Sequence, residues 1–290
     1  MQNEIKMKAI RRIEAIRRIA IFAVIAAIGF AACVDAGDDA CSYCSWIVTA
    51  QPTCTTVGNA TRLCSVCEVS NADIPALGHN YNWVFKYTEY PATLTESCNR
   101  CLVIRTTTRP VKIGDTGPGG GIIFYVADGQ EGRTLGFSVT STSSAFTTYT
   151  AYYLEGAPAN SGAMRWTTQT SWSLAPDVTG TSQIIGSGRN NTALIIAAEK
   201  AAYPTNTYIY AALACDNYNT ATASDWFLPS RNELNELYRQ RSYFGLSSGY
   251  FWSSSQSSSS GAWVQDFSTG VQSSNGLKNT NSSVRAVRAF

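Results

Sequence analysis

The strongest constraint on the fold lies in the last 180 residues, which begin and end on segments typical of β-strands. In the first segment, 111–125, a glycine-rich turn leads into the run Ile-Ile-Phe-Tyr, and the last segment, 283–290, contains Val, Arg, Ala and Phe. Between them the chain is rich in Ser, Thr, Asn, Gly and Trp, with one Cys and no His. This pattern predicts a β-rich scaffold with a polar, aromatic surface and few groups suited to catalysis.

The overall charge excludes a nucleic-acid-binding protein. Charged residues make up only 14% of the chain and aromatic residues 11%, which favours an extracellular β-rich protein over a disordered one. Six of the 22 basic residues and two of the 20 acidic residues lie in 1–32, so the remainder carries 16 basic and 18 acidic residues. A protein that binds nucleic acid would need a basic face.

Residues 1–32 have the layout of a bacterial lipoprotein signal peptide. A basic stretch is followed by the apolar run 20–32, whose thirteen residues are too few for a membrane-spanning helix of about 20. Phe30-Ala31-Ala32-Cys33 resembles a lipobox, with Phe30 in the usual place of Leu. We expect cleavage before Cys33, lipidation of that thiol, a flexible tether over 33–40, and anchoring in the outer membrane or at the cell surface. An ordinary signal peptide and an uncleaved anchor are the alternatives.

Residues 41–109 form a cysteine-rich segment with an internal repeat. Trp46 leads through Cys54 to one Cys-x-x-Cys pair, and Trp83 leads to another, with Leu94 where the first copy has Cys54. Residues 76–81, Ala-Leu-Gly-His-Asn-Tyr, join the copies. The segment resembles a repeat of bacterial surface proteins, in which short β-hairpins alternate with Cys-x-x-Cys knuckles that end in a Leu-Gly-His-Asx-Tyr link.

Two chemistries compete for the paired cysteines. Knuckles of this kind can place four thiolates around zinc, whereas an oxidising compartment outside the cytoplasm favours disulfides. Redox catalysis is a third reading, but no βαβ pattern surrounds any pair. We interpret His79 as a turn residue beside Tyr81, with zinc ligation as the alternative. The candidate metal or disulfide residues are Cys41, Cys44, Cys64, Cys67, Cys98 and Cys101.

The region 110–290 combines helix and strand signals. We expect helices over 190–202, with a polar cap, and over 208–215. Ser230 and Glu233 have the spacing of a capping box, followed by an apolar face at Leu234, Leu237 and Tyr238. Strands are expected at 250–255, 262–267 and 284–290, with a polar hairpin at 270–281.

Several motifs of this region resemble one family when taken in order. They are Gly-Asp-Thr-Gly-Pro at 114–118, Gly-Gly-Ile-Ile-Phe-Tyr at 120–125, Tyr-Leu-Glu-Gly-Ala-Pro at 153–158, Gly-Ser-Gly at 186–188, Asp-Trp-Phe-Leu-Pro-Ser at 225–230, Phe-Trp-Ser-Ser at 251–254 and Val-Arg-Ala-Val-Arg at 284–288. Together they resemble the domain named after the C-terminal region of the Legionella collagen-like adhesin, which is similar to C-type lectins. The resemblance implies an α+β, C-type-lectin-like domain over 110–290, with its first and last strands paired side by side.

The resemblance and the composition together point to binding through the loops at 253–282. Trp stacking and Asn or Gln hydrogen bonds are common means of holding sugars or proteins. The competing interpretation places Trp226, Trp252 and Trp263 in the core and Arg285 and Arg288 on a solvated strand edge. The candidate ligand-binding residues are Trp263, Gln265, Asp266, Gln272, Asn275, Lys278, Asn279 and Asn281.

An enzyme is the weakest functional class for this sequence. Cys215 stands alone in an apolar helix, which suggests a buried, inert thiol rather than half of a formylglycine-generating pair. No His is available as a base, and Asp225, Glu233 and Asp266 would form an acid pair only by accident of fold. We also expect no essential calcium. The sequence therefore favours an adhesin-like surface lipoprotein that binds a host or microbial glycan or protein, with a structural envelope component as the alternative.

Overall fold

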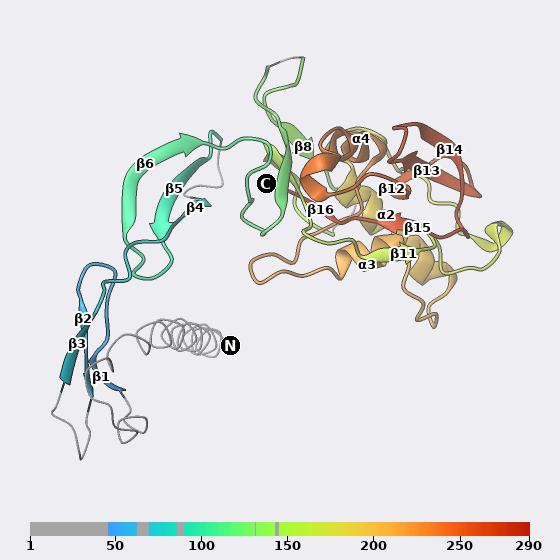
Figure 1. Ribbon diagram of the computed structural model, residues 1–290. Coiled ribbons are helices and arrows are strands. Elements are labelled where there is room, and N and C mark those ends of the chain that lie inside the picture. Colours follow the sequence, from blue (N-terminus) through green and yellow to red (C-terminus); the bar gives the residue numbers. More distant parts are fainter. Residues whose placement is uncertain (1–45, 63–69, 86–89, 131, 143–144) are drawn as a thin grey trace. The chain divides into compact units, whose positions relative to one another are not determined.

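The computed structural model describes residues 46–62, 70–85, 90–130, 132–142 and 145–290 (Figure 1). These residues form a mixed, sheet-rich fold with a few helices, which agrees with the predicted α+β class. The expected signal peptide, the lipidation site Cys33 and the candidate ligands Cys41, Cys44, Cys64 and Cys67 lie outside the described residues. In the described part of the chain, no helix is both long and apolar enough to cross a lipid bilayer.

The chain divides into two compact units. The first comprises residues 1–80 and 99–102, and the second comprises 81–98 and 103–290. The predicted domain boundary lies between 109 and 110, whereas the strands of the second repeat copy belong to the same unit as the C-terminal region. The ion pair between Arg109 and Asp115, at 2.6 Å, crosses that sequence boundary within the second unit.

The first unit contains one antiparallel sheet of three strands. The strands β1 (Trp46–Ala50), β2 (Gly58–Arg62) and β3 (Ser70–Ile74) are ordered β1-β2-β3. Gly58 is required where the chain turns back, because a Cβ atom there would lie 2.5 Å from the carbonyl oxygen of Ala50. The buried side chains of this unit include Ala60 and Ile74.

The second repeat copy forms a sheet of the same order. The strands β4 (Tyr81–Phe85), β5 (Thr93–Cys98) and β6 (Ile104–Pro110) are antiparallel and ordered β4-β5-β6. The matching order agrees with the repeat seen in the sequence. Leu94, which stands where the first copy has Cys54, is buried with Ala92, Tyr153 and Phe290 in one apolar cluster.

The first and last strands of the C-terminal region lie in one sheet but are not neighbours. The strands β7 (Ile122–Val126), β10 (Tyr153–Gly156) and β16 (Val287–Ala289) are ordered β16-β10-β7, and both pairings are antiparallel. The predicted side-by-side pairing of the end strands is therefore wrong. The physical reason is that β10 fills the place between them and hydrogen-bonds to both.

A buried carboxylate on β10 ties this sheet together. Glu155 accepts hydrogen bonds from the backbone N–H groups of Gly119 (2.9 Å) and Gly121 (3.0 Å) in the turn before β7. Arg288 on β16 donates to the same carboxylate at 2.8 Å and also pairs with Asp225. Burial raises the pKa of Glu155, and the bond from Arg288 opposes that rise.

The predicted solvated edge at the chain's last arginines is also wrong. Arg285 is only 4% exposed, and its Nη1 donates to the carbonyl of Ala157. Arg288 is largely buried by its two ion pairs. Because charged side chains are costly to bury without partners, the strand sequence alone favoured a solvated edge.

A five-stranded sheet carries most of the remaining strands. It contains β11 (Gly162–Met164), β15 (Ser282–Val284), β12 (Tyr250–Gln256), β13 (Gly261–Asp266) and β14 (Gln272–Leu277), in that spatial order. The pairing of β12 with β15 is parallel and the others are antiparallel. The single last strand predicted at 284–290 is split, with β15 in this sheet and β16 in the other. A separate pair joins β8 (Phe137–Val139) to β9 (Tyr149–Ala151).

Helices α2 and α4 lie against the five-stranded sheet (Figure 1). The described helices are α2 (Gly188–Ala202), α3 (Ala211–Asp216) and α4 (Arg231–Arg239), with short 3-10 turns η2 (Trp172–Leu174) and η3 (Arg241–Phe244). The capping box of α4 is confirmed, because Ser230 Oγ accepts from Glu233 N and the Glu233 carboxylate accepts from Ser230 N. The polar cap expected for α2 at Asn190 is wrong: the helix starts at Gly188.

The large aromatic side chains fill the core of the second unit. Trp226 and Trp252 are buried, as the competing interpretation of the sequence predicted. The indole N–H of Trp252 donates to the carbonyl of Met164 at 2.9 Å, so its polar atom is satisfied inside the core. Cys215 is fully buried in the same cluster, in agreement with a packing role.

Candidate metal centre and candidate ligand-binding loops

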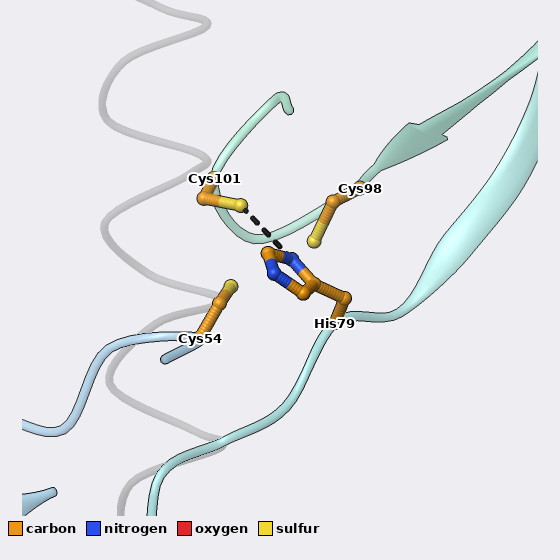
Figure 2. Close-up of side chains that lie close together, drawn as sticks. All are labelled: Cys54, His79, Cys98 and Cys101. Atoms are coloured by element: carbon orange, nitrogen blue, oxygen red, sulfur yellow. Dashed lines mark hydrogen bonds between the residues drawn. The ribbon is translucent and has the colours of Figure 1, made fainter. Parts of the chain in front are cut away.

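Four potential metal ligands converge in the cysteine-rich segment (Figure 2). The ligand atoms of Cys54, His79, Cys98 and Cys101 all lie within 4.8 Å of one another. Cys54 follows β1, His79 lies in the link between the repeat copies, and Cys98 and Cys101 bound the knuckle after β5. Three of them belong to the first unit, and Cys98 directly precedes its 99–102 segment.

Backbone hydrogen bonds hold the segments that carry these ligands. The N–H of Asn99 in the knuckle donates to the carbonyl of Asn80, next to His79, at 2.9 Å. The N–H of Leu77 in the link donates to the carbonyl of Thr53, next to Cys54, at 2.8 Å. The link is thereby held to both neighbouring segments, so His79 is placed between Cys54 and the knuckle.

A tight turn places Cys54. The side-chain oxygen of Thr53 accepts from the N–H of Thr56 at 3.0 Å, and the N–H of Thr53 donates to the carbonyl of Thr56 at the same distance. Threonine hydroxyls stabilise turns by such local bonds. Cys54 lies inside this turn and is buried.

The donor set is suited to a closed metal site. The distance between Cys101 Sγ and His79 Nδ1 is 3.4 Å, close to the edge of about 3.6 Å expected between S and N ligands on tetrahedral zinc. Cys54 and Cys98 are buried, whereas His79 and Cys101 are exposed. Three cysteines and one histidine could hold a metal ion. Four side-chain ligands are the number that surrounds a tetrahedral metal ion in a structural site.

Of the six cysteines predicted as metal or disulfide residues, the structure describes two, Cys98 and Cys101, and both belong to the cluster. The other two ligands are Cys54, which had no partner in the Cys-x-x-Cys pattern, and His79, which was interpreted as a turn residue. The number of histidines and cysteines in the sequence could have pointed to both residues. His79 is the only histidine of the chain, and Cys54 leaves an odd number of cysteines in the segment.

Much of 253–282, predicted as binding loops, belongs to strands β12, β13 and β14 in the structure. Two of the predicted ligand-binding residues of this region are fully buried, which corrects their predicted place on the surface. The ammonium group of Lys278 donates to Gln256 Oε1 (2.6 Å) and to the carbonyls of Pro176 (2.7 Å) and Ser259 (2.8 Å). Burial lowers the pKa of Lys278 to about 8. The amide of Gln265 is also inside and donates to Asn235 Oδ1 at 2.9 Å. Since internal oxygens use these donors, neither side chain is presented to a ligand.

Three further predicted residues use their polar groups within the protein. Gln272 donates to the carbonyl of Arg231 at 2.8 Å, and Asn279 donates to the carbonyl of Thr170 at 2.9 Å. Asp266 accepts from the backbone and side chain of Ser268 inside its own turn, and these bonds lower its pKa. These side chains fix loop shape, which leaves fewer of the predicted groups to meet a ligand.

The remaining three predicted residues are more accessible. Trp263 is half-buried, and the guanidinium group of Arg231 lies 3.9 Å from the centre of its ring. Asn275 and Asn281 are exposed. The structure therefore leaves the two asparagine amides as the most accessible of the predicted ligand-binding groups.

Exposed aromatic side chains also occur outside the predicted loops. Trp172, on η2, is 50% exposed, and Leu174 beside it is 56% exposed. The hydroxyl of Tyr203 donates to the carbonyl of Leu174 at 2.5 Å, which joins this turn to the loop after α2. That loop exposes Tyr208, with the guanidinium group of Arg165 3.9 Å from its ring centre. This surface was not predicted, although residues 166–176 contain two tryptophans and no charged residue.

The side chains considered for catalysis make separate structural contacts. Cys215 is fully buried, which raises the pKa of its thiol well above the ordinary value. Asp225 pairs with Arg288, and Glu233 completes the capping box of α4. Asp266 is held in its own turn. These three carboxylates are thus engaged with different elements.

No protein-family model matches the sequence, and no curated protein matches it. What the cysteine–histidine cluster and the C-terminal loops can do therefore follows from their chemistry alone.

Proposed function

We propose that Cys54, His79, Cys98 and Cys101 bind one structural zinc ion. The observation that carries this proposal is the convergence of three sulfur ligands and one nitrogen ligand within 4.8 Å. Thiolates and imidazole are the donors that zinc favours, and a Cys₃His set is typical of closed structural sites. A metal would also stabilise a small unit whose sheet has few buried apolar side chains.

The same cluster favours a metal over disulfides. A disulfide joins two sulfurs, so any pairing within the cluster would use two thiols and exclude the third thiol and the imidazole. A tetrahedral ion uses all four groups at once. The converging nitrogen of His79 has no role in a disulfide, and it is the feature that separates the two chemistries.

Zinc content of the purified full chain tests this proposal. We expect the C98S/C101S double variant to retain about one zinc ion fewer per chain than the unchanged protein, as measured by elemental analysis. The C215A variant is the control, because Cys215 is buried in an apolar cluster and is not one of the four candidate ligands. Equal zinc content in the unchanged protein and the double variant would overturn the assignment.

We further propose that the chain is an adhesin-like surface lipoprotein whose C-terminal, C-type-lectin-like region binds a glycan or protein ligand. This proposal rests on a contrast between buried polar groups that hold the fold together and exposed polar groups that can contact a ligand. The buried carboxylate of Glu155 ties together the sheet that holds the chain's last strand, whereas Asn275 is exposed on the edge strand β14 and Asn281 on the loop that follows it. Loops on a rigid scaffold are where binding groups are usually carried.

The exposed groups suit a ligand with hydroxyl or amide groups. Asparagine amides offer both donors and acceptors, and exposed aromatic rings such as those of Trp172 and Tyr208 offer faces for stacking. A structural envelope component remains the second candidate, and it needs no exposed recognition groups. A formylglycine-generating enzyme is supported least, because Cys215 is buried and the fold gives it no second cysteine among the described residues of the C-terminal region.

Binding of the full, detergent-solubilised chain to glycan and matrix-protein arrays tests the adhesin proposal. We expect signals that fall at least tenfold in an N275A/N281A/W172A variant. The T222A variant is the control, since Thr222 is also exposed but lies on a different loop. A correctly folded chain that binds nothing above background would favour the structural alternative.

Membrane attachment through Cys33 has its own test. We expect the unchanged chain to incorporate labelled fatty acid and to sediment with membranes, and the C33A variant to do neither. Membrane sedimentation of C33A without label would instead indicate an uncleaved anchor.

A further inference from the structure

Arg100 lies within the knuckle between Cys98 and Cys101 and reaches the link that carries His79. Its Nη1 donates to the carbonyl oxygen of Leu77 and, at 3.0 Å, to that of Gly78. These two carbonyls belong to the residues directly before His79. One guanidinium nitrogen therefore connects the loop of two cysteine ligands to the backbone of the histidine ligand.

We infer that Arg100 is the positioning residue of the metal centre and that it selects Nδ1 of His79 as the metal-binding nitrogen. This inference rests on the proposed zinc site. The two bonds fix the peptide groups on either side of Gly78, which has a left-handed φ of +65°. With its backbone held there, His79 places Nδ1 3.4 Å from Cys101 Sγ.

The guanidinium group is suited to this task. It is permanently charged and rigid, and it presents several donors in a fixed plane, so it can hold two carbonyl oxygens at once. Partners outside the ligand shell commonly orient metal-binding histidines, and their loss costs about 10–100-fold in metal affinity. Lysine keeps the charge and the donors but lacks the rigid plane.

The positive charge of Arg100 would also favour metal binding. Three thiolates around a divalent ion leave a net charge of about −1 on the centre. A nearby cation reduces that excess charge. Arg100 is exposed to solvent, so this contribution is small beside its effect on the position of His79.

The single histidine of the chain makes the inference directly testable. In the untagged full chain labelled with ¹⁵N only at histidine, long-range ¹H–¹⁵N spectra contain the two ring nitrogens of His79 alone. With zinc bound, we expect Nδ1 to show the shift of a metal-bound nitrogen and Nε2 to carry the proton. In the R100A variant we expect this pattern to be lost or mixed, with zinc affinity about 10–100-fold weaker.

Two further variants separate positioning from folding and from general charge. R100K should restore most of the zinc affinity and part of the Nδ1 pattern, whereas K112A, which removes an exposed cation elsewhere, should change neither. An R100A spectrum and affinity identical to those of the unchanged protein would overturn the role of Arg100. If zinc leaves the histidine spectrum of the unchanged protein unaltered, the proposed zinc site itself fails.

Discussion

At the residue scale, the knuckle of the proposed metal centre contains a backbone conformation that is unfavourable for the residue that adopts it. Leu102, directly after Cys101, has φ of +61° and is 74% exposed. Left-handed backbone is costly for residues with a Cβ atom, and an exposed leucine recovers little of that cost through burial. The knuckle geometry that brings Cys98 and Cys101 together is thus maintained against the preference of Leu102.

We predict that the L102G substitution stabilises the first unit. Glycine adopts positive φ without steric cost, and the expected gain is about 1 kcal/mol after its larger unfolded-state entropy is included. Urea unfolding of the full chain, followed by a probe in residues 46–80, measures the change. V103G is the control, because Val103 is not among the residues with positive φ, and it should lose stability. A destabilised L102G variant would contradict the argument.

A second residue-scale prediction concerns the buried carboxylate of Glu233. Burial raises its pKa from 4.5 to about 7, although backbone N–H groups of Gly186, Gly188 and Ser230 oppose the rise. Since the folded-state pKa lies above the unfolded value, the folded chain binds the extra proton between these pH values. The associated stability is fully present below pH 4.5 and is lost as the pH rises through about 7.

The pH dependence of unfolding tests this prediction. Between pH 4.5 and 7 the free energy of unfolding should fall by up to about 3 kcal/mol in the unchanged chain. In E233Q, which cannot titrate, that part of the slope should disappear. An unchanged slope in E233Q would show that other groups cause the dependence.

At the scale of elements, one strand organises both ends of the C-terminal region. β10 lies between β7 and β16. Its Glu155 carboxylate accepts a hydrogen bond from the turn before β7 and forms an ion pair with Arg288 on β16. Gly119 is needed for this approach, because a Cβ atom there would lie 2.5 Å from Glu155 Oε1. Backbone pairing and a buried ion pair thus act on the same three strands.

We predict that R288M destabilises the second unit by about 3 kcal/mol, because it leaves the Glu155 carboxylate buried without its cation. The matched control is R133M. Arg133 pairs with Asp128 at 3.0 Å, but both side chains are about a quarter exposed, so its loss should cost less than about 1 kcal/mol. Chemical denaturation measures both. Equal losses of unfolding free energy in the two variants would show that the buried ion pair stabilises the fold no more than the exposed one.

At the scale of the whole molecule, the two units depend on different sources of stability. The second unit has three apolar clusters that contain Trp, Phe and Tyr side chains. In the first unit, by contrast, the described buried apolar residues are Cys54, Ala60 and Ile74. A small core of this kind supplies little hydrophobic stabilisation, so metal ligation would supply a large share of the stability of the first unit.

Metal removal should therefore act mainly on the first unit and leave the apolar core of the second unit intact. With a strong chelator present, we predict that amide hydrogen exchange accelerates at least tenfold in 46–62 and 70–80, while α2 and β12 keep their protection. Hydrogen-exchange mass spectrometry of the full chain measures both regions in one experiment. Equal acceleration in the two units, or none in the first, would contradict a local structural role for the metal.

Much of the local structure could be predicted from short-range patterns. The capping box at Ser230 and Glu233 depends on residues three apart, and the repeat around Trp46 and Trp83 reappears as two sheets with the same order. The burial of Trp252 also followed from its strand context. Prediction succeeds for these features because backbone preference and side-chain periodicity depend on residues that are close in the sequence.

Side-chain environments set by distant partners could not be predicted in the same way. Lys278 was predicted as a surface cation in a polar loop, yet its ammonium group is buried and donates to the carbonyls of Pro176 and Ser259. Arg285 looked like part of a solvated edge and is buried beside Ala157. In each case the acceptor is far away in the chain or belongs to the backbone, so residue type and spacing carry no signal for it.

The sequence by itself determined that the chain ends in a β-rich, cysteine-poor region and that the segment before it is a cysteine-containing repeat. Only the tertiary structure decided that β10 separates the end strands, and that Cys54 and His79 join Cys98 and Cys101. The physical reason is the same for both. Strand order and ligand sets are fixed by long-range hydrogen bonds and packing, which bring together residues that no local pattern connects.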